Sequence, residues 1–167
     1  DELAPAFRIL DEDDSVRAII VRGSGDHFSY GLDLMAMMPV LGDKMMGTVL
    51  ARKRAELLRL IHKMQAAAGA PAACRKPVIA AIDGWCIGGG LDLVAACDIR
   101  ICSAQARFSL REIKLAIVAD LGSLQRLPAI IGQGHTRQLA FTGEDIDAQR
   151  ALQIGLVNDV YDNAEAL

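Results

Sequence analysis

Residues 76–127 read KPVIAAIDGWCIGGGLDLVAACDIRICSAQARFSLREIKLAIVADLGSLQRL, and this stretch decides the fold prediction. We expect strands at 78–82, 99–102 and 107–109, and the continuous apolar run at 78–82 is typical of a strand buried in a parallel sheet. The turn Gly88-Gly89-Gly90 opens a longer apolar segment at about 91–97, for which we expect a helix. Strands that alternate with helices predict an α/β fold with a largely parallel sheet.

The flanking sequence extends this alternation in both directions. Before the central stretch we expect a helix over 3–10, a buried strand over 18–21 and a helix over 49–65 with apolar residues at helical spacing. After it we expect helices over 121–131 and 136–141, and a last helix that Asp147 caps and that ends before Gly155. A closing strand over 157–160 completes the predicted order, and residues 1–167 are interpreted as a single core domain.

Composition narrows the function classes. The chain has 167 residues, is 52% hydrophobic and carries a formal charge of −3, and it shows no basic stripe of the kind that binds nucleic acid. No apolar run is long enough to predict a membrane span. The four cysteines form no CxxC pair and have no histidine at ligand spacing, so we expect reduced thiols in a cytoplasmic protein and no metal site.

Three carboxylates, those of Asp92, Glu112 and Asp120, stand in otherwise apolar sequence. Carboxylates are costly to bury, and proton transfer is the chemistry that best explains such a group. Each has a structural alternative. Asp92 can cap the first turn of its helix, Glu112 can pair in solvent with Arg111 or Lys114, and Asp120 can cap the helix that follows it.

Two glycine-centred turns follow predicted strands, FSYGLDL at 28–34 and CIGGG at 86–90. Glycine lets backbone N–H groups turn outward and approach a ligand closely. One N–H from each turn, aimed at one oxygen, would form an oxyanion hole. The alternative is a pair of tight turns without a ligand. The GGG sequence does not fit GxGxxG spacing, which argues against a dinucleotide fold.

Four segments together resemble the enoyl-CoA hydratase/isomerase (crotonase) superfamily: FSYGLDLMAM, KPVIAAIDGWCIGGGLDL, ACDIRICSAQARFSLREI and TGEDIDAQRALQIGLVNDV. They occur in the family's order along nearly the whole chain. The resemblance implies a ClpP/crotonase-like layered fold of repeated ββα units, an acyl-CoA substrate and no separate cofactor. It implies that the backbones of Leu32 and Gly89 hold the thioester oxygen. The substrate-binding residues implied are Tyr30, Gly31, Ile87, Gly88 and Ile117.

Within that superfamily the acids are most similar to the Δ3,5-Δ2,4-dienoyl-CoA isomerase branch. Hydratases usually carry Glu at the position of Asp92 and Gly at the position of Asp120, whereas that branch has the trio Asp, Glu, Asp. The resemblance implies that Glu112 and Asp120 shuttle protons between C2 and C6 while Asp92 orients them. An apolar wall is expected to raise the carboxylate pKa values; it consists of Trp85, Ile87, Ile117 and Val118.

The resemblance also sets the alternatives. The leading interpretation is a dienoyl-CoA isomerase of fatty acid β-oxidation, the runner-up is an enoyl-CoA hydratase, and the third is a non-catalytic acyl-CoA-binding or structural fragment. Family members usually form homotrimers or hexamers through a C-terminal helical segment. Relative to the family, we interpret this chain as shortened at both ends, without the first strand and without that segment.

Overall fold

The computed structural model describes residues 2–45 and 50–167, which form two small sheets surrounded by helices. The first sheet is parallel, with strands in the order β1, β2, β4, β7. The second has the order β3, β5, β6, with β5 and β6 antiparallel. The strands are β1 (Ile19–Arg22), β2 (Val78–Ile82), β3 (Trp85–Ile87), β4 (Ile99–Ser103), β5 (Arg107–Ser109), β6 (Ile146–Asp147) and β7 (Asp159–Tyr161).

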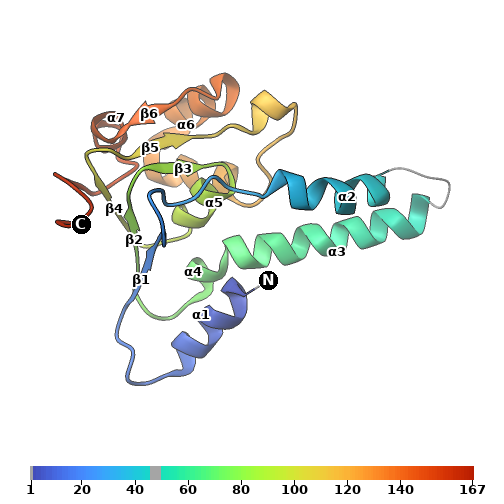
Figure 1. The fold of residues 1–167 in the computed structure, drawn as a ribbon, viewed down its shortest axis with the longest axis horizontal. Helices are drawn as coiled ribbons and strands as arrows, with labels where there is room; N and C mark the ends of the chain where they lie inside the picture. The colour runs from blue at the N-terminus through green and yellow to red at the C-terminus, as the bar shows by residue number, and fades with distance from the viewer. Residues whose placement is uncertain (1, 46–49) are drawn as a thin grey trace.

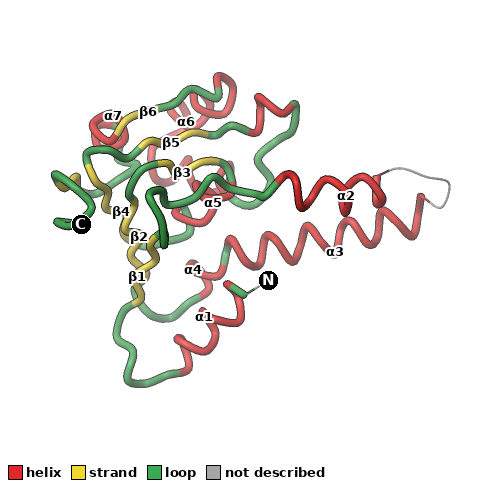
Figure 2. Tube along the Cα trace, viewed as in Figure 1, coloured by secondary structure: helices red, strands yellow, loops and turns green. Residues whose placement is uncertain are grey.

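The helices lie on different sides of the two sheets (Figure 1, Figure 2). Helices α2 and α3 pack against each other and extend together away from the sheets, whereas α6 and α7 lie beside β5 and β6. The helices are α1 (Leu3–Glu12), α2 (Leu34–Met45), α3 (Leu50–Ala68), α4 (Ala70–Ala73), α5 (Gly89–Val94), the 3₁₀ helix η1 (Glu112–Leu115), α6 (Ser123–Thr142) and α7 (Ala148–Gln153).

A repeated ββα unit organises the central part of the chain. Strand β2 enters the first sheet, β3 enters the second, and α5 follows. Strands β4 and β5 repeat this course and lead through η1 to α6. The layered ββα expectation is therefore confirmed, and the glycine turn at 88–90 lies where the first complete unit passes from strand to helix.

The strand predicted over 18–21 is present but is not buried throughout. It runs from Ile19 to Arg22 at the edge of its sheet, and Ile20 is 65% exposed because among the described residues no layer covers its outer face. The two helices expected over 121–131 and 136–141 run on as α6, interrupted at Gly132, whose φ of 77° and ψ of 162° are not helical. Residue 49, the expected start of the helix that is now α3, lies outside the described residues.

The core forms between the parallel sheet and α5. Val78, Ile82, Leu91 and Val94 are fully buried there, and Phe108 of β5 joins them. All four cysteines are free, as predicted, and three of them are buried in or beside this core. None of the helices in the described ranges is long and apolar enough to cross a membrane.

Candidate active site

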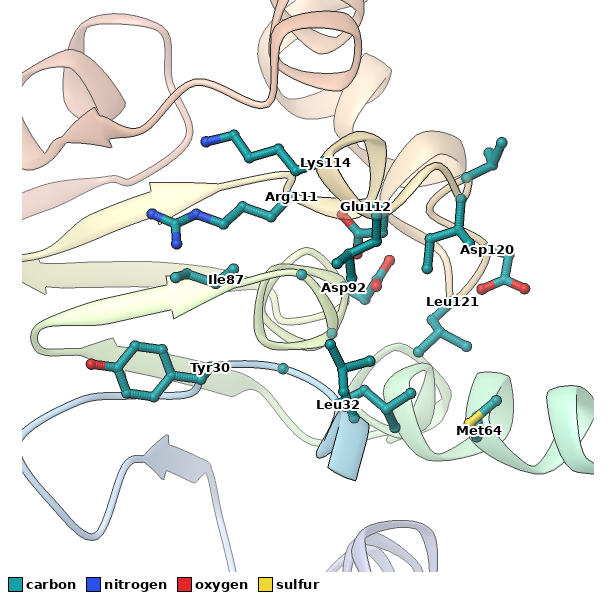
Figure 3. Close-up of a pocket in the computed structure, with 17 residues that line it drawn as sticks. Tyr30, Leu32, Met64, Ile87, Asp92, Arg111, Glu112, Lys114, Asp120 and Leu121 are labelled. Carbon is teal, nitrogen blue, oxygen red and sulfur yellow. The ribbon is translucent and has the colours of Figure 1, made fainter. Parts of the chain in front are cut away.

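One cavity of about 400 Å³ contains every residue that the sequence analysis named as catalytic, oxyanion-binding or substrate-binding (Figure 3). The turn before α2, the turn from β3 to α5, η1 and the loop from η1 to α6 bound it, and α3 contributes one side. The predicted residues that line it are Tyr30, Gly31, Leu32, Ile87, Gly88, Gly89, Asp92, Glu112, Ile117 and Asp120. The fold thus brings together residues that are up to 90 positions apart in the chain.

The two glycine turns are in direct contact, and backbone hydrogen bonds hold them together. Ser29 N–H donates to the Trp85 carbonyl at 2.9 Å, and Ile87 N–H donates to the Ser29 carbonyl at 2.9 Å. Gly31 has φ +84°, and a Cβ there would lie 2.8 Å from the Ile87 carbonyl oxygen and 3.0 Å from the Gly89 nitrogen. Glycine is therefore required at position 31 for both the backbone conformation and the close approach of the turns.

The amides of Leu32 and Gly89 are the two expected donors. Gly89 is the first residue of α5, where a helix leaves its N–H groups without intrahelical partners. The backbone N–H groups of Leu32 and Gly89 donate no hydrogen bond to any protein acceptor within residues 2–45 and 50–167. A Cβ on Gly89 would lie 3.7 Å from the Leu32 nitrogen, so the two unused donors are close to each other in the cavity lining.

Asp92 is almost completely buried, with 1% of its surface exposed. One carboxylate oxygen accepts a 2.7 Å hydrogen bond from Ser123 N–H, while the other has no partner among the described residues. Burial raises the pKa of Asp92 and the charge of Asp120 adds to the rise, against the opposing effects of Ser123 and Arg126. Asp92 does act as a cap, but on the first residue of α6 rather than on its own helix.

Glu112 lies beside the glycine turn, and a Cβ on Gly88 would be 3.1 Å from its carboxylate. Glu112 Oε2 is buried without a partner among the described residues. Burial raises the pKa of Glu112, and the charges of Asp92 and Asp120 raise it further.

The alternative that paired Glu112 with Arg111 or Lys114 is wrong. Arg111 binds Asp145 through two hydrogen bonds of 3.1 and 2.7 Å, and Lys114 lies 3.9 Å from the same carboxylate. Both cations are therefore directed to Asp145, which leaves Glu112 free to face the cavity.

Asp120 is exposed, but it belongs to the same cavity wall, and its charge raises the pKa values of Asp92 and Glu112. It does not cap α6, because Gly122 occupies the N-cap position and Asp92 provides the acceptor. The backbone carbonyl of Asp120 accepts a 2.7 Å hydrogen bond from the side chain of Gln65 on α3.

The apolar wall differs from the prediction in two respects. Ile87 is buried as expected, but Ile117 is 52% exposed and Val118 is 71% exposed, because their loop forms the open side of the cavity. Trp85 does not line the cavity. Its ring packs against Arg111, whose guanidinium carbon lies 5.0 Å from the ring centroid.

Sequence reasoning missed several lining residues. The cations Arg111 and Lys114 lie toward the Tyr30 end of the cavity, on the opposite side of Glu112 from Asp120 (Figure 3). The remaining ones are apolar: Leu34, Met64, Leu115 and Leu121. The helical spacing of α3 indicated an apolar face but not what that face contacts. Within the described ranges, no cluster of three or more His, Cys, Asp or Glu residues is arranged to hold a metal ion.

Comparison with known proteins identifies the family of the chain. Over residues 1–167 the chain matches the family model described as enoyl-CoA hydratase/isomerase. It is 46% identical to a peroxisomal Δ3,5-Δ2,4-dienoyl-CoA isomerase of Arabidopsis thaliana, covering 99% of this chain and 60% of that protein. It is 42% identical to the mitochondrial protein of the same name from Dictyostelium discoideum, with 99% and 56% covered.

A solved structure shows the same fold. The enoyl-CoA hydratase from Bacillus anthracis superposes with a TM-score of 0.82 at 33% identity, over 96% of this chain and 58% of that one. The chain thus spans somewhat more than half the length of the proteins it matches. It has the crotonase fold, and it belongs to the enoyl-CoA hydratase/isomerase family.

Proposed function

We propose that the protein carrying this chain is a dienoyl-CoA isomerase that converts a 3,5-dienoyl-CoA into the conjugated 2,4-dienoyl-CoA in fatty acid β-oxidation. The observation that carries the proposal is the presence of Asp92, Glu112 and Asp120 in one cavity with two unused backbone amides. The names of the two curated relatives support the same reaction.

The amides of Leu32 and Gly89 bind the thioester oxygen in this proposal. Loss of a proton from C2 gives a dienolate whose negative charge lies largely on that oxygen, and two N–H donors stabilise it. Oxyanion donors of this kind contribute about 10²–10³ each to a rate. Because both donors belong to tight turns held by Ser29, they need little rearrangement when the charge develops.

The carboxylates move the protons. Glu112 lies against the Gly88 backbone, close to the amide pair, so we assign it to the C2 proton. Asp120 lies at the end of the cavity away from Tyr30 and is assigned to C6 (Figure 3). The C2–H bond breaks toward Glu112, the two double bonds shift by one position, and a C6–H bond forms with a proton from Asp120. Asp92, fixed by Ser123, orients the pair and raises the pKa of Glu112 by its charge.

Arg111 and Lys114 give the cavity a charge gradient that suits such a substrate. They lie at the Tyr30 end, while the acids lie toward the other end (Figure 3). Asp145 neutralises one of the two positive charges, so this end keeps an excess of positive charge. An acyl-CoA has anionic phosphates at one end and the reacting acyl chain at the other, and this arrangement orients it with the phosphates toward Lys114.

The test is an absorbance assay for the conjugated 2,4-dienoyl product, with wild type beside Asp120→Asn. The full-length protein should produce the signal, and Asp120→Asn should lower the rate by about 10²–10⁴-fold, as expected when a proton donor is lost. Asp14→Asn, an exposed change in the turn after α1, is the control and should have the activity of wild type. Absence of product from full-length wild type would overturn the proposal.

Two other outcomes identify the alternatives. Hydration of crotonyl-CoA that is insensitive to Asp120→Asn indicates an enoyl-CoA hydratase. Thermal stabilisation by CoA esters, with every reaction unchanged by Glu112→Gln and Asp120→Asn, indicates a non-catalytic acyl-CoA-binding protein.

Two further implications of the family resemblance stay proposals. One is that residues 1–167 form a single core domain, and the other is that the protein assembles as a homotrimer or hexamer. The cytoplasmic location is also a prediction, and the relatives' names favour a peroxisome or mitochondrion instead.

A further inference from the structure

We propose that Gln65 is a positioning residue for Asp120: its side-chain amide holds the loop that carries this acid at the C6 end of the substrate. The inference rests on the proposed isomerase function. It arises from one long-range contact, in which Gln65 Nε2 donates a 2.7 Å hydrogen bond to the backbone carbonyl of Asp120, 55 residues away in the sequence.

The loop around Asp120 needs an anchor of this kind. Residues 118–121 belong to no helix or strand, and in the described part of the chain their backbone amides have no protein acceptor. A residue with positive φ lies on each side of this segment: Ala116 before it, with φ 56°, and Gly122 after it, with φ 131°. The segment is therefore bounded by two left-handed residues and depends on contacts from outside to fix its position.

Helix α3 is a suitable support for that anchor. Gln65 lies in its last turns, half-buried, and its neighbour Met64 lines the same cavity. The same two regions approach each other at a second point, since Arg126 Nη2 would lie 3.0 Å from a Cβ added to Gly69, just beyond the end of α3. The Arg126 guanidinium also occupies the space that a Cβ on Gly122 would need. The end of α3 thus contacts the loop through Gln65 on one side and approaches Arg126 on the other.

The position of the hydrogen bond explains why it affects the acid. The acceptor is the carbonyl of Asp120 itself, so the contact fixes the main chain from which the carboxylate extends. A catalytic group must be held to within about 0.5 Å of its productive position, and an exposed side chain on an unsupported loop is not held so closely. Gln65 acts on the proton relay through Asp120 and does not touch the reacting carbons.

The decisive experiment is a double-mutant cycle in the full-length protein with a 3,5-dienoyl-CoA substrate. Gln65→Met keeps the length of the side chain and removes its donor, and we expect kcat to fall about tenfold while KM changes less than twofold. Gln65→Lys restores a donor and should recover part of kcat. In an Asp120→Asn background Gln65→Met should change the residual rate less than twofold, because positioning no longer matters when the acid is absent. Gln149→Met, an exposed change on α7, is the control and should match wild type.

A general structural role for Gln65 predicts a different pattern. The loss caused by Gln65→Met would then be the same with and without Asp120, and the melting temperature would fall with it; either result overturns the inference. If full-length wild type shows no isomerisation, the proposed function fails by itself, and hydrogen exchange still tests the contact. Amides 118–121 should exchange several-fold faster in Gln65→Met than in wild type or Gln149→Met. Unchanged exchange would overturn the inference.

Discussion

The carboxylate of Asp92 on α5 accepts a 2.7 Å hydrogen bond from the backbone amide of Ser123, the first residue of α6. One acid of the site therefore supplies the cap that α6 lacks from its own sequence, since Gly122 has no side chain to provide it. We expect loss of this contact to weaken the start of α6, which directly follows the loop that carries Asp120.

Replacement of Asp92 should separate its structural contribution from its charge. Asp92→Ala leaves a buried N–H without an acceptor, and we expect the free energy of unfolding to fall by about 1–3 kcal/mol. Asp92→Asn keeps a carbonyl oxygen for Ser123 N–H and should stay within about 1 kcal/mol of wild type. Urea denaturation measures both, with the exposed Asp162→Ala as the control. Equal losses for Ala and Asn would show that the hydrogen bond does not stabilise the fold.

Gly31→Ala should disrupt the contact between the two glycine turns. The new Cβ requires a left-handed backbone, and it would lie 2.8 Å from the Ile87 carbonyl oxygen. We expect a loss of about 1–3 kcal/mol in the free energy of unfolding, together with a large fall in kcat because the Leu32 and Gly89 amides separate. Gly25→Ala is the matched control, since a Cβ there would meet nothing within 4 Å. The prediction is contradicted if both variants have the stability of wild type.

Glu112→Gln should change how stability depends on pH. Burial raises the pKa of Glu112 above 4.5, so the folded state binds its proton more tightly than the unfolded state. The stability that this proton contributes is fully present below pH 4.5, and it is lost as the pH rises through the raised pKa of Glu112 in the folded state. The Gln variant cannot ionise, and its melting temperature relative to wild type should therefore increase from pH 4 to pH 8. The exposed Glu12→Gln is the control, and parallel curves for wild type and Glu112→Gln would refute the expectation.

Lys114→Ala should weaken binding of the CoA part of the substrate. The proposal places the phosphates toward this cation, so KM for a dienoyl-CoA should rise about three- to tenfold, within the range of an exposed charge contact. The effect should shrink at high salt. A dienoyl thioester of N-acetylcysteamine, which lacks phosphates, should react equally with both proteins. Arg137→Ala, exposed on α6, serves as the control. An equal rise in KM for both thioesters would contradict this role for Lys114.

Sequence patterns predicted the parts of the fold that depend on local order. The apolar runs at 78–82 and 99–102 became β2 and β4, and Asp147 caps α7 by accepting a 2.8 Å hydrogen bond from Arg150 N–H. Helix α2 was not expected, because Pro39 and Gly42 weaken the helical pattern there, whereas packing against α3 stabilises it. Strand β3, three residues between Gly84 and the glycine turn, was also not expected.

The sequence analysis named residues that the fold gathers around one cavity, but it did not predict the contacts between them. The three acids line the cavity, and so do Tyr30, Gly31, Leu32, Gly88 and Gly89 of the two turns. The sequence did not reveal that Asp92 caps α6, that Arg111 donates to Asp145, or that Gln65 donates to the Asp120 carbonyl. Each of these contacts joins residues at least 31 positions apart, and their partners are set by how the helices pack, which no local pattern records.

The pair of amides at Leu32 and Gly89 belongs to the main chain, and backbone bonds through Ser29 fix the distance between the two turns. Almost every substitution at positions 32 and 89 leaves a peptide N–H in place, so the proposed contact with a thioester oxygen does not depend on the side chains there. The acids, in contrast, are side chains on three separate segments and can be exchanged one at a time. In the proposed mechanism, the choice of reaction therefore depends on which carboxylates surround the amide pair, whereas the amides themselves need no particular side chain.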